Sequence, residues 1–186
     1  KYPAKEEWSE IVKRPHLDVS KLNATVQGVL DDVKKHGDEA VKRYEEMFDH
    51  AHLDSLAVTE AEIEEAEQLV SQELKDALHL AHHNIAAFHQ SQKFAGEKVE
   101  TCPGVTCWQK SVAIQKVGLY IPGGTAPLFS TVLMLATPAK IAGCEEIVLC
   151  TPPNQEGKVN PAILMAAKIA GVSKIFKAGG VQAIGA

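Results

Sequence analysis

The segment at residues 117–136 constrains the fold more than any other part of the chain. It reads VGLYIPGGTAPLFSTVLMLA, in which strand-forming residues run into Pro122 and two glycines, and an apolar stretch follows with Pro127 near its start. Glycines let the backbone approach a ligand closely, and a proline at the first helical position is pre-organised for a helix. The segment therefore predicts a strand, a tight loop and a helix, with the loop facing a ligand at the carboxyl end of an α/β sheet. Pro138 cannot donate to the Met134 carbonyl, so this helix should kink or split there.

An internal repeat follows this segment. The sequence AKIAG occurs at residues 139–143 and again at 167–171, and a strand-like triplet follows each copy at the same 28-residue offset. Each unit is the end of a helix, a glycine suited to the left-handed position after the helix, and a strand. A helix-and-strand period near 30 residues is typical of βαβ units, which place their strands in parallel. We expect at least three parallel strands, near residues 117–121, 146–150 and 174–177.

The first hundred residues read as amphipathic helices. A cationic turn before Gly37 ends one helix, and Asp38 begins the next. The expected apolar face of that second helix consists of Val41, Tyr44, Met47 and Phe48. Thr59 and Glu62 form a capping box, in which each side chain satisfies a free backbone donor of the other residue. Ser71 then begins a longer helix with an apolar stripe at helical spacing.

Charge and strand pattern divide the chain into two parts. Residues 1–100 carry a formal charge of −9 and residues 101–186 carry +4. A cationic second half suits an anionic dinucleotide, although buried strands and the helices that cover them also carry few charges. Alternation around a Pro-Gly turn predicts a hairpin near 99–115. We therefore expect a mainly helical part at 1–115 and a doubly wound parallel-sheet domain that begins at 116 and runs to 186.

The composition excludes several classes of protein. No apolar run approaches the roughly 20 residues that a membrane span requires, and residues 1–8 lack the apolar core of a secretory signal. The basic residues form no stripe of the kind that binds nucleic acid. We expect a cytoplasmic protein with neither a membrane nor a nucleic-acid partner.

The cysteines and histidines raise the questions of disulfides, nucleophiles and metals. Cys102 and Cys107 flank the Pro-Gly turn and could face each other across the hairpin, but reduced thiols are expected in a cytosolic chain. Cys150 ends a predicted strand, where an inert buried thiol is more common than a nucleophile. Four histidines share one predicted helix: His79, His82, His83 and His89. A catalytic metal site needs a third ligand and a walled cavity, so we assign these histidines to the surface.

Two polar side chains are candidates for contact with a ligand. A second glycine pair at residues 179–180 follows the third predicted strand, so it should share a sheet edge with the pair at 123–124. We expect the two turns to end neighbouring strands and to form one crevice. Gln182 could offer an amide there and Tyr120 a ring and a hydroxyl. From the residues alone, Gln182 could equally be a surface residue at a helix start and Tyr120 a ring packed under the loop.

Residues 117–144 closely resemble histidinol dehydrogenase, as do VLCTPP at 148–153 and AGGVQAI at 178–184. The likeness continues more weakly upstream, through residues 36–40 and 99–107. It implies an α/β fold of the aldehyde dehydrogenase-like superfamily, in which a helical N-terminal part precedes an incomplete Rossmann-like, NAD-binding parallel sheet. A sheet that stops after its third strand has an open edge and uncovered apolar faces. We expect the chain to self-associate or to pack its helical half over that gap.

The resemblance also implies a function. The family oxidises L-histidinol through histidinal to L-histidine with NAD, as a zinc-dependent homodimer. Tyr120 and Gln182 occupy matching motif positions and are implied NAD contacts, whereas no catalytic or zinc-ligating residue is carried over to this chain. Family members are far longer, so we expect an N-terminal segment that is inactive alone. Two alternatives are another dehydrogenase of the same superfamily with a cysteine nucleophile, and a non-catalytic module that binds a nucleotide or a partner.

Overall fold

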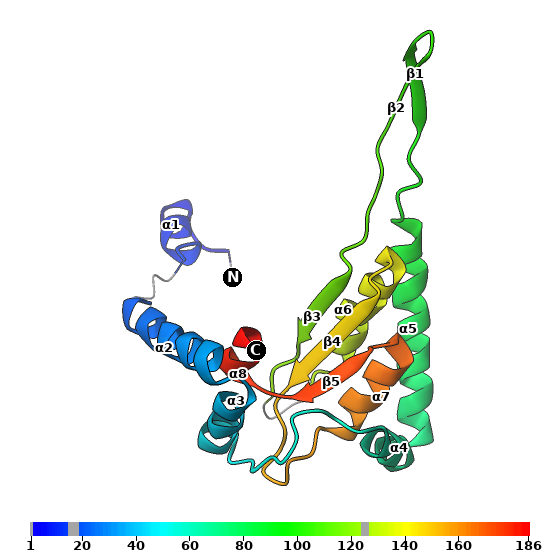
Figure 1. Ribbon diagram of the computed structural model, residues 1–186. Coiled ribbons are helices and arrows are strands. Elements are labelled where there is room, and N and C mark those ends of the chain that lie inside the picture. The colour runs from blue at the N-terminus through cyan, green and yellow to red at the C-terminus, as the bar shows by residue number, and fades with distance from the viewer. Residues whose placement is uncertain (1, 15–18, 124–126) are drawn as a thin grey trace.

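The computed structural model describes residues 2–14, 19–123 and 127–186, and Figure 1 shows their arrangement. At its centre lies a three-stranded parallel sheet with the strand order β3-β4-β5. The strands are β3 (Lys116–Tyr120), β4 (Glu146–Thr151) and β5 (Lys174–Lys177). Each strand starts and ends within one residue of the range that the repeat predicts, so the expected parallel sheet is confirmed.

The register of the sheet separates two hydrophobic cores. One row of paired residues packs against the first core: Leu119, Leu149 and Ile175. The next row packs against the second core: Tyr120, Cys150 and Phe176. Successive side chains of a strand point to opposite faces, so a register shift of one residue would exchange the two rows. The pairing therefore decides which side chains reach each layer of helices.

Four helices cover the first face of the sheet. They are α4 (Glu60–Leu69), α5 (Gln72–Ser91), α6 (Phe129–Ala142) and α7 (Pro161–Ala170). Both repeat helices end on glycines with positive φ, 91° at Gly143 and 74° at Gly171, as the AKIAG motif predicts. The expectation that Pro127 occupies the first helical position is wrong, because α6 begins two residues later. At Pro138 a kink or a split was expected, and the helix continues through this residue without splitting. α6 packs between α5 and α7, and Pro138 leaves one backbone hydrogen bond of the helix unmade.

The second face carries α2 (Ser20–His36), α3 (Asp38–Tyr44), the π-helical turn η2 (Glu45–Asp49) and α8 (Gly180–Gly185). Two short elements, η1 (Lys5–Glu7) and α1 (Trp8–Ile11), precede them. The prediction of an apolar, buried face on the second helix is wrong beyond Tyr44, because Met47 is 62% exposed and Phe48 is 55% exposed. The wider π-turn changes the helical period, so that Glu45 is buried in their place.

The open edge of β5 is covered by the chain itself. Residues 56–58 run antiparallel to the strand, and the Val58 N–H donates to the Ile175 carbonyl at 2.9 Å. The Lys177 N–H in turn donates to the Leu56 carbonyl at 2.7 Å. Part of the N-terminal half therefore packs over this edge, which is one of the two expected outcomes, and self-association stays a prediction.

The hairpin consists of β1 (Lys98–Cys102) and β2 (Val105–Trp108), and it extends beyond the end of α5, away from the sheet (Figure 1). The predicted hairpin is therefore present, but it ends at Trp108, and residues 109–115, which were included in the prediction, form no strand. Its register pairs Cys102 with Val105 and Cys107 with Val99, so the two cysteines do not face each other, and both thiols are free. Among the described residues, no helix combines the length and the apolar character that crossing a bilayer requires.

We predict that Glu62→Gln lowers stability in a pH-dependent way. Glu62 completes the capping box with Thr59 and pairs with the half-buried Lys177 at 2.6 Å. Burial raises the pKa of Glu62, but the bonds from Lys177 and Thr59 prevail and hold this pKa below its ordinary value. A glutamine keeps the cap and loses the charge, so the free energy of unfolding should fall by about 1 kcal/mol at pH 7.

A lowered pKa stabilises the folded state above the ordinary pKa of a glutamate, and this contribution is lost as the pH falls through the lowered value. The difference between Glu62→Gln and the wild type, measured by urea unfolding, should therefore vanish in acid. Glu60→Gln removes a charge from the same first helical turn and serves as the control. A difference that persists unchanged in acid would contradict the assignment.

Candidate functional site

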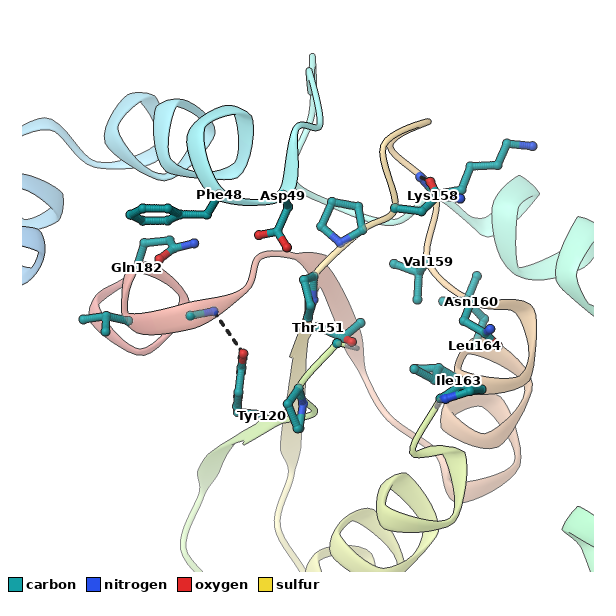
Figure 2. A pocket seen from close by; sticks show the side chains of 18 of the residues that line it. Phe48, Asp49, Tyr120, Thr151, Lys158, Val159, Asn160, Ile163, Leu164 and Gln182 are labelled. Atoms are coloured by element: carbon teal, nitrogen blue, oxygen red, sulfur yellow. Dashed lines mark hydrogen bonds between the residues drawn. The ribbon is translucent and has the colours of Figure 1, made fainter. Parts of the chain in front are cut away.

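A cavity of about 910 Å³ opens at the carboxyl end of the sheet (Figure 2). Residues from the ends of all three strands line one side of it: Tyr120, Pro122, Thr151, Pro152, Gly180 and Gln182. The π-turn contributes Phe48 and Asp49, and the opposite wall is formed by residues 158–164 before and within α7. Ligands of open α/β sheets bind at this position. The cavity therefore lies at the edge that the two glycine pairs predict.

The two glycine-bearing turns meet, although their strands are not neighbours. β4 lies between β3 and β5, so the expectation that the turns end adjacent strands is wrong. Each crossover helix adds the next strand on the same side, which leaves β4 in the middle. The Gly180 N–H nevertheless donates to the Tyr120 Oη at 3.0 Å, as the dashed line in Figure 2 shows. The Tyr120 side chain thus bridges the end of β4 and joins the two turns.

Pro152, in the turn after β4, explains why glycines are needed in the turns after β3 and β5. A Cβ placed on Gly123 would lie 2.5 Å from Pro152 Cγ, and a Cβ on Gly179 would lie 2.8 Å from Pro152 Cβ. Any larger residue at either position would have to displace the proline ring. The second glycine of the first pair, Gly124, lies outside the described residues. The three turns therefore pack against one another at Pro152.

Gln182 is a buried residue of this wall, not a surface residue at a helix start. Its side chain is 1% exposed, and its Nε2 donates to the Glu45 Oε1 at 2.9 Å. A Cβ on Gly180 would lie 2.7 Å from the Gln182 Oε1, so the carboxamide folds back over the turn. Tyr120 packs against the second core, while its hydroxyl reaches the turn before Gln182. Both predicted residues border the same cavity.

Glu45 is the residue of this site that the sequence analysis missed. It is fully buried, and its Oε1 also accepts the Gly179 N–H at 2.9 Å. Burial raises the pKa of this carboxyl, and the charge of Asp49 raises it further. The one sequence signal was a glutamate at a position where a regular helix would be apolar, and the π-turn that buries it cannot be read from local periodicity.

The described residues of the cavity include one polar group without a hydrogen-bond partner. The Thr151 Oγ1 is buried at the end of β4 without a hydrogen-bond partner among the described residues. The part of the chain that the structure describes contains no group of three or more His, Cys, Asp or Glu side chains placed to hold a metal ion. His79 and His83 are exposed, while His82 and His89 are half-buried.

Cys150 is poorly suited to be a nucleophile. It lies in the middle strand and packs against the second core. Burial raises the pKa of its thiol, and the nearby Glu45 charge raises it further. A nucleophilic cysteine requires the opposite shift, because the thiolate is the reactive form.

Comparisons with known proteins agree on one family. The family model described as histidinol dehydrogenase matches residues 12–186. A histidinol dehydrogenase from Bacteroides fragilis is 66% identical over 100% of this chain and 44% of its own length. Another, from Escherichia coli K12, is 47% identical over 97% of this chain and 41% of its own length. The crystal structure of histidinol dehydrogenase from Elizabethkingia anophelis has a TM-score of 0.93 and 47% identity over 98% of this chain and 42% of that one. The chain spans less than half the length of these relatives.

We predict that Gly180→Ala disturbs the wall at Gln182. Gly180 has φ of 53°, and an added Cβ would meet the Gln182 carboxamide. Gly104→Ala, in the hairpin, is the matched control because its φ of 84° imposes similar strain while no atom lies within 4 Å of its added Cβ. In urea unfolding, Gly180→Ala should lose about 1 kcal/mol more stability than the control. Equal losses would show that the carboxamide does not pack over Gly180.

Proposed function

This chain belongs to the histidinol dehydrogenase family, and from that premise we propose that it is the N-terminal segment of an enzyme that oxidises L-histidinol through histidinal to L-histidine. The observation that carries the proposal is the cavity at the carboxyl end of the parallel sheet, which both Tyr120 and Gln182 line and where the Tyr120 hydroxyl accepts the Gly180 N–H. Its volume of about 910 Å³ is at the upper end of the range of small-molecule and cofactor sites.

We propose NAD as the cofactor of this cavity. NAD, when bound, accepts the hydride that leaves the alcohol or the aldehyde hydrate. Tyr120 and Gln182 would hold it, the turn at Gly179 and Gly180 would allow its close approach, and the buried Thr151 hydroxyl offers an unused hydrogen-bonding group. These groups bind and orient; none of them is placed to accept the proton that alcohol oxidation releases.

The proton acceptor and the zinc site therefore belong to other parts of the full-length enzyme. Glu45 is the buried carboxyl nearest the glycine turn, but its Oε1 is already occupied by two donors. We propose that the complete protein is a cytoplasmic, zinc-dependent homodimer and that this chain contributes no catalytic residue and no metal ligand. Histidine biosynthesis is the corresponding pathway.

We also propose a division of the chain near residue 115. Residues 116–186 contain all three strands of the parallel sheet, which supports assigning them to the start of a Rossmann-like NAD-binding domain. Residues 1–115 are mainly helical and end in the hairpin. Membership of the aldehyde dehydrogenase-like superfamily is part of the same proposal. A member with a cysteine nucleophile is disfavoured in this segment, because burial raises the pKa of Cys150.

The proposal predicts opposite results for two proteins. The full-length protein that contains this chain should reduce NAD when L-histidinol is added, as measured by NADH absorbance. The 186-residue chain alone should show no such activity, because it lacks a placed proton acceptor. An inactive full-length protein with zinc present would contradict the proposed function. Activity of the purified segment, free of full-length protein, would contradict the assignment of catalysis to the remaining sequence.

A further inference from the structure

Glu45 connects the helical layer to the nucleotide end of the sheet. It comes from the π-turn η2, yet both hydrogen bonds of its Oε1 cross to the segment after β5, to the Gly179 N–H and to the Gln182 Nε2, each at 2.9 Å. The carboxyl is fully buried. A buried carboxyl is costly unless its bonds compensate for lost hydration. The two hydrogen bonds from Gly179 and Gln182 therefore explain how a carboxyl is accommodated at this buried position.

The first consequence concerns the orientation of the Gln182 carboxamide. The Glu45 Oε1 accepts the Gly179 N–H, and the Gln182 Nε2 donates to the same oxygen. The group of Gln182 that faces the carboxyl is therefore its NH₂, not its carbonyl. Glu45 thereby fixes which end of the amide points at the helical layer and leaves the Gln182 Oε1 above Gly180.

The second consequence concerns the turn itself. Two successive amides are held by two different side chains: Gly179 by Glu45 and Gly180 by the Tyr120 hydroxyl. Gly180 has φ of 53°, a conformation that a glycine turn can readily leave when it is not held. Glu45, the turn and Tyr120 therefore form one continuous chain of hydrogen bonds along the cavity wall.

The other oxygen of Glu45 is buried as well. The Oε2 has no hydrogen-bond partner among the described residues. Burial raises the pKa of this carboxyl, the bonds from Gly179 and Gln182 oppose that effect, and Asp49 raises the pKa further. The hydrogen bonds that connect Glu45 to the glycine turn are therefore those of its Oε1.

We propose that Glu45 is a positioning residue for the cofactor site: it orients the Gln182 carboxamide and the Gly179–Gly180 turn through its Oε1. The inference rests on the proposed function, because NAD is the ligand proposed for the cavity that Gln182 and the turn line. Glu45 touches neither the cofactor nor the reacting atoms in this assignment, and acts only through Gln182 and the turn.

The test compares three variants of the full-length protein. Glu45→Ala removes the acceptor, and we expect the KM for NAD to rise about tenfold or more while the KM for L-histidinol stays near the wild-type value. Glu45→Gln retains an acceptor oxygen and should rescue the KM for NAD to within about threefold of the wild type. Glu46→Ala is the matched control, because Glu46 is the neighbouring glutamate of the same turn and is exposed to solvent.

Hydrogen exchange supplies a readout that does not depend on NAD. In Glu45→Ala, the amides of residues 178–182 should exchange faster, whereas those of α7 should exchange as in the wild type. An unchanged KM for NAD together with unchanged exchange would overturn the proposal. Faster exchange throughout the protein, with both KM values raised, would also overturn it by indicating general destabilisation. A wild-type protein without activity would refute the proposed function, and the exchange at 178–182 would still decide whether Glu45 orders the turn.

Discussion

The parallel pairing of β4 with both of its neighbours is the constraint on which the site depends. This pairing brings Tyr120, Cys150 and Phe176 into one row, so the three strands end at nearly the same level. The turns that follow them are then close enough to pack around Pro152 and to share the bond between Tyr120 and Gly180. Two crossovers of similar length produce this arrangement, and the cavity is its direct result.

The helical layer belongs to the site and does not merely cover the sheet. Phe48 and Asp49 line the cavity from the π-turn, and Glu45 reaches from the same turn to the glycine segment after β5. Residues 56–58 then pass beside β5 and lead into the helices on the opposite face. One continuous stretch of the N-terminal half therefore shapes the mouth of the cavity and closes the edge of the sheet.

Short sequence patterns correctly predicted the features that depend only on residues close together in the chain. The strands, the glycine ends of α6 and α7, and the capping box of Thr59 follow from neighbouring residues, and all three are found. The burial of Glu45 could not be predicted, because it requires a π-turn and a partner segment more than a hundred residues away. The strand order was also missed, since glycine turns locate the edge of a sheet and carry no information about which strand lies in the middle. The roles of Tyr120 and Gln182 in binding NAD stay predictions.

The central claim is that a dinucleotide binds where the three turns meet. A crystal structure of the full-length protein with NAD tests it most directly. The account predicts NAD in the cavity, in contact with Tyr120 and Gln182, with the bond from Gln182 to Glu45 retained. NAD bound at the amino ends of the strands, or on a surface that leaves this cavity empty, would contradict it.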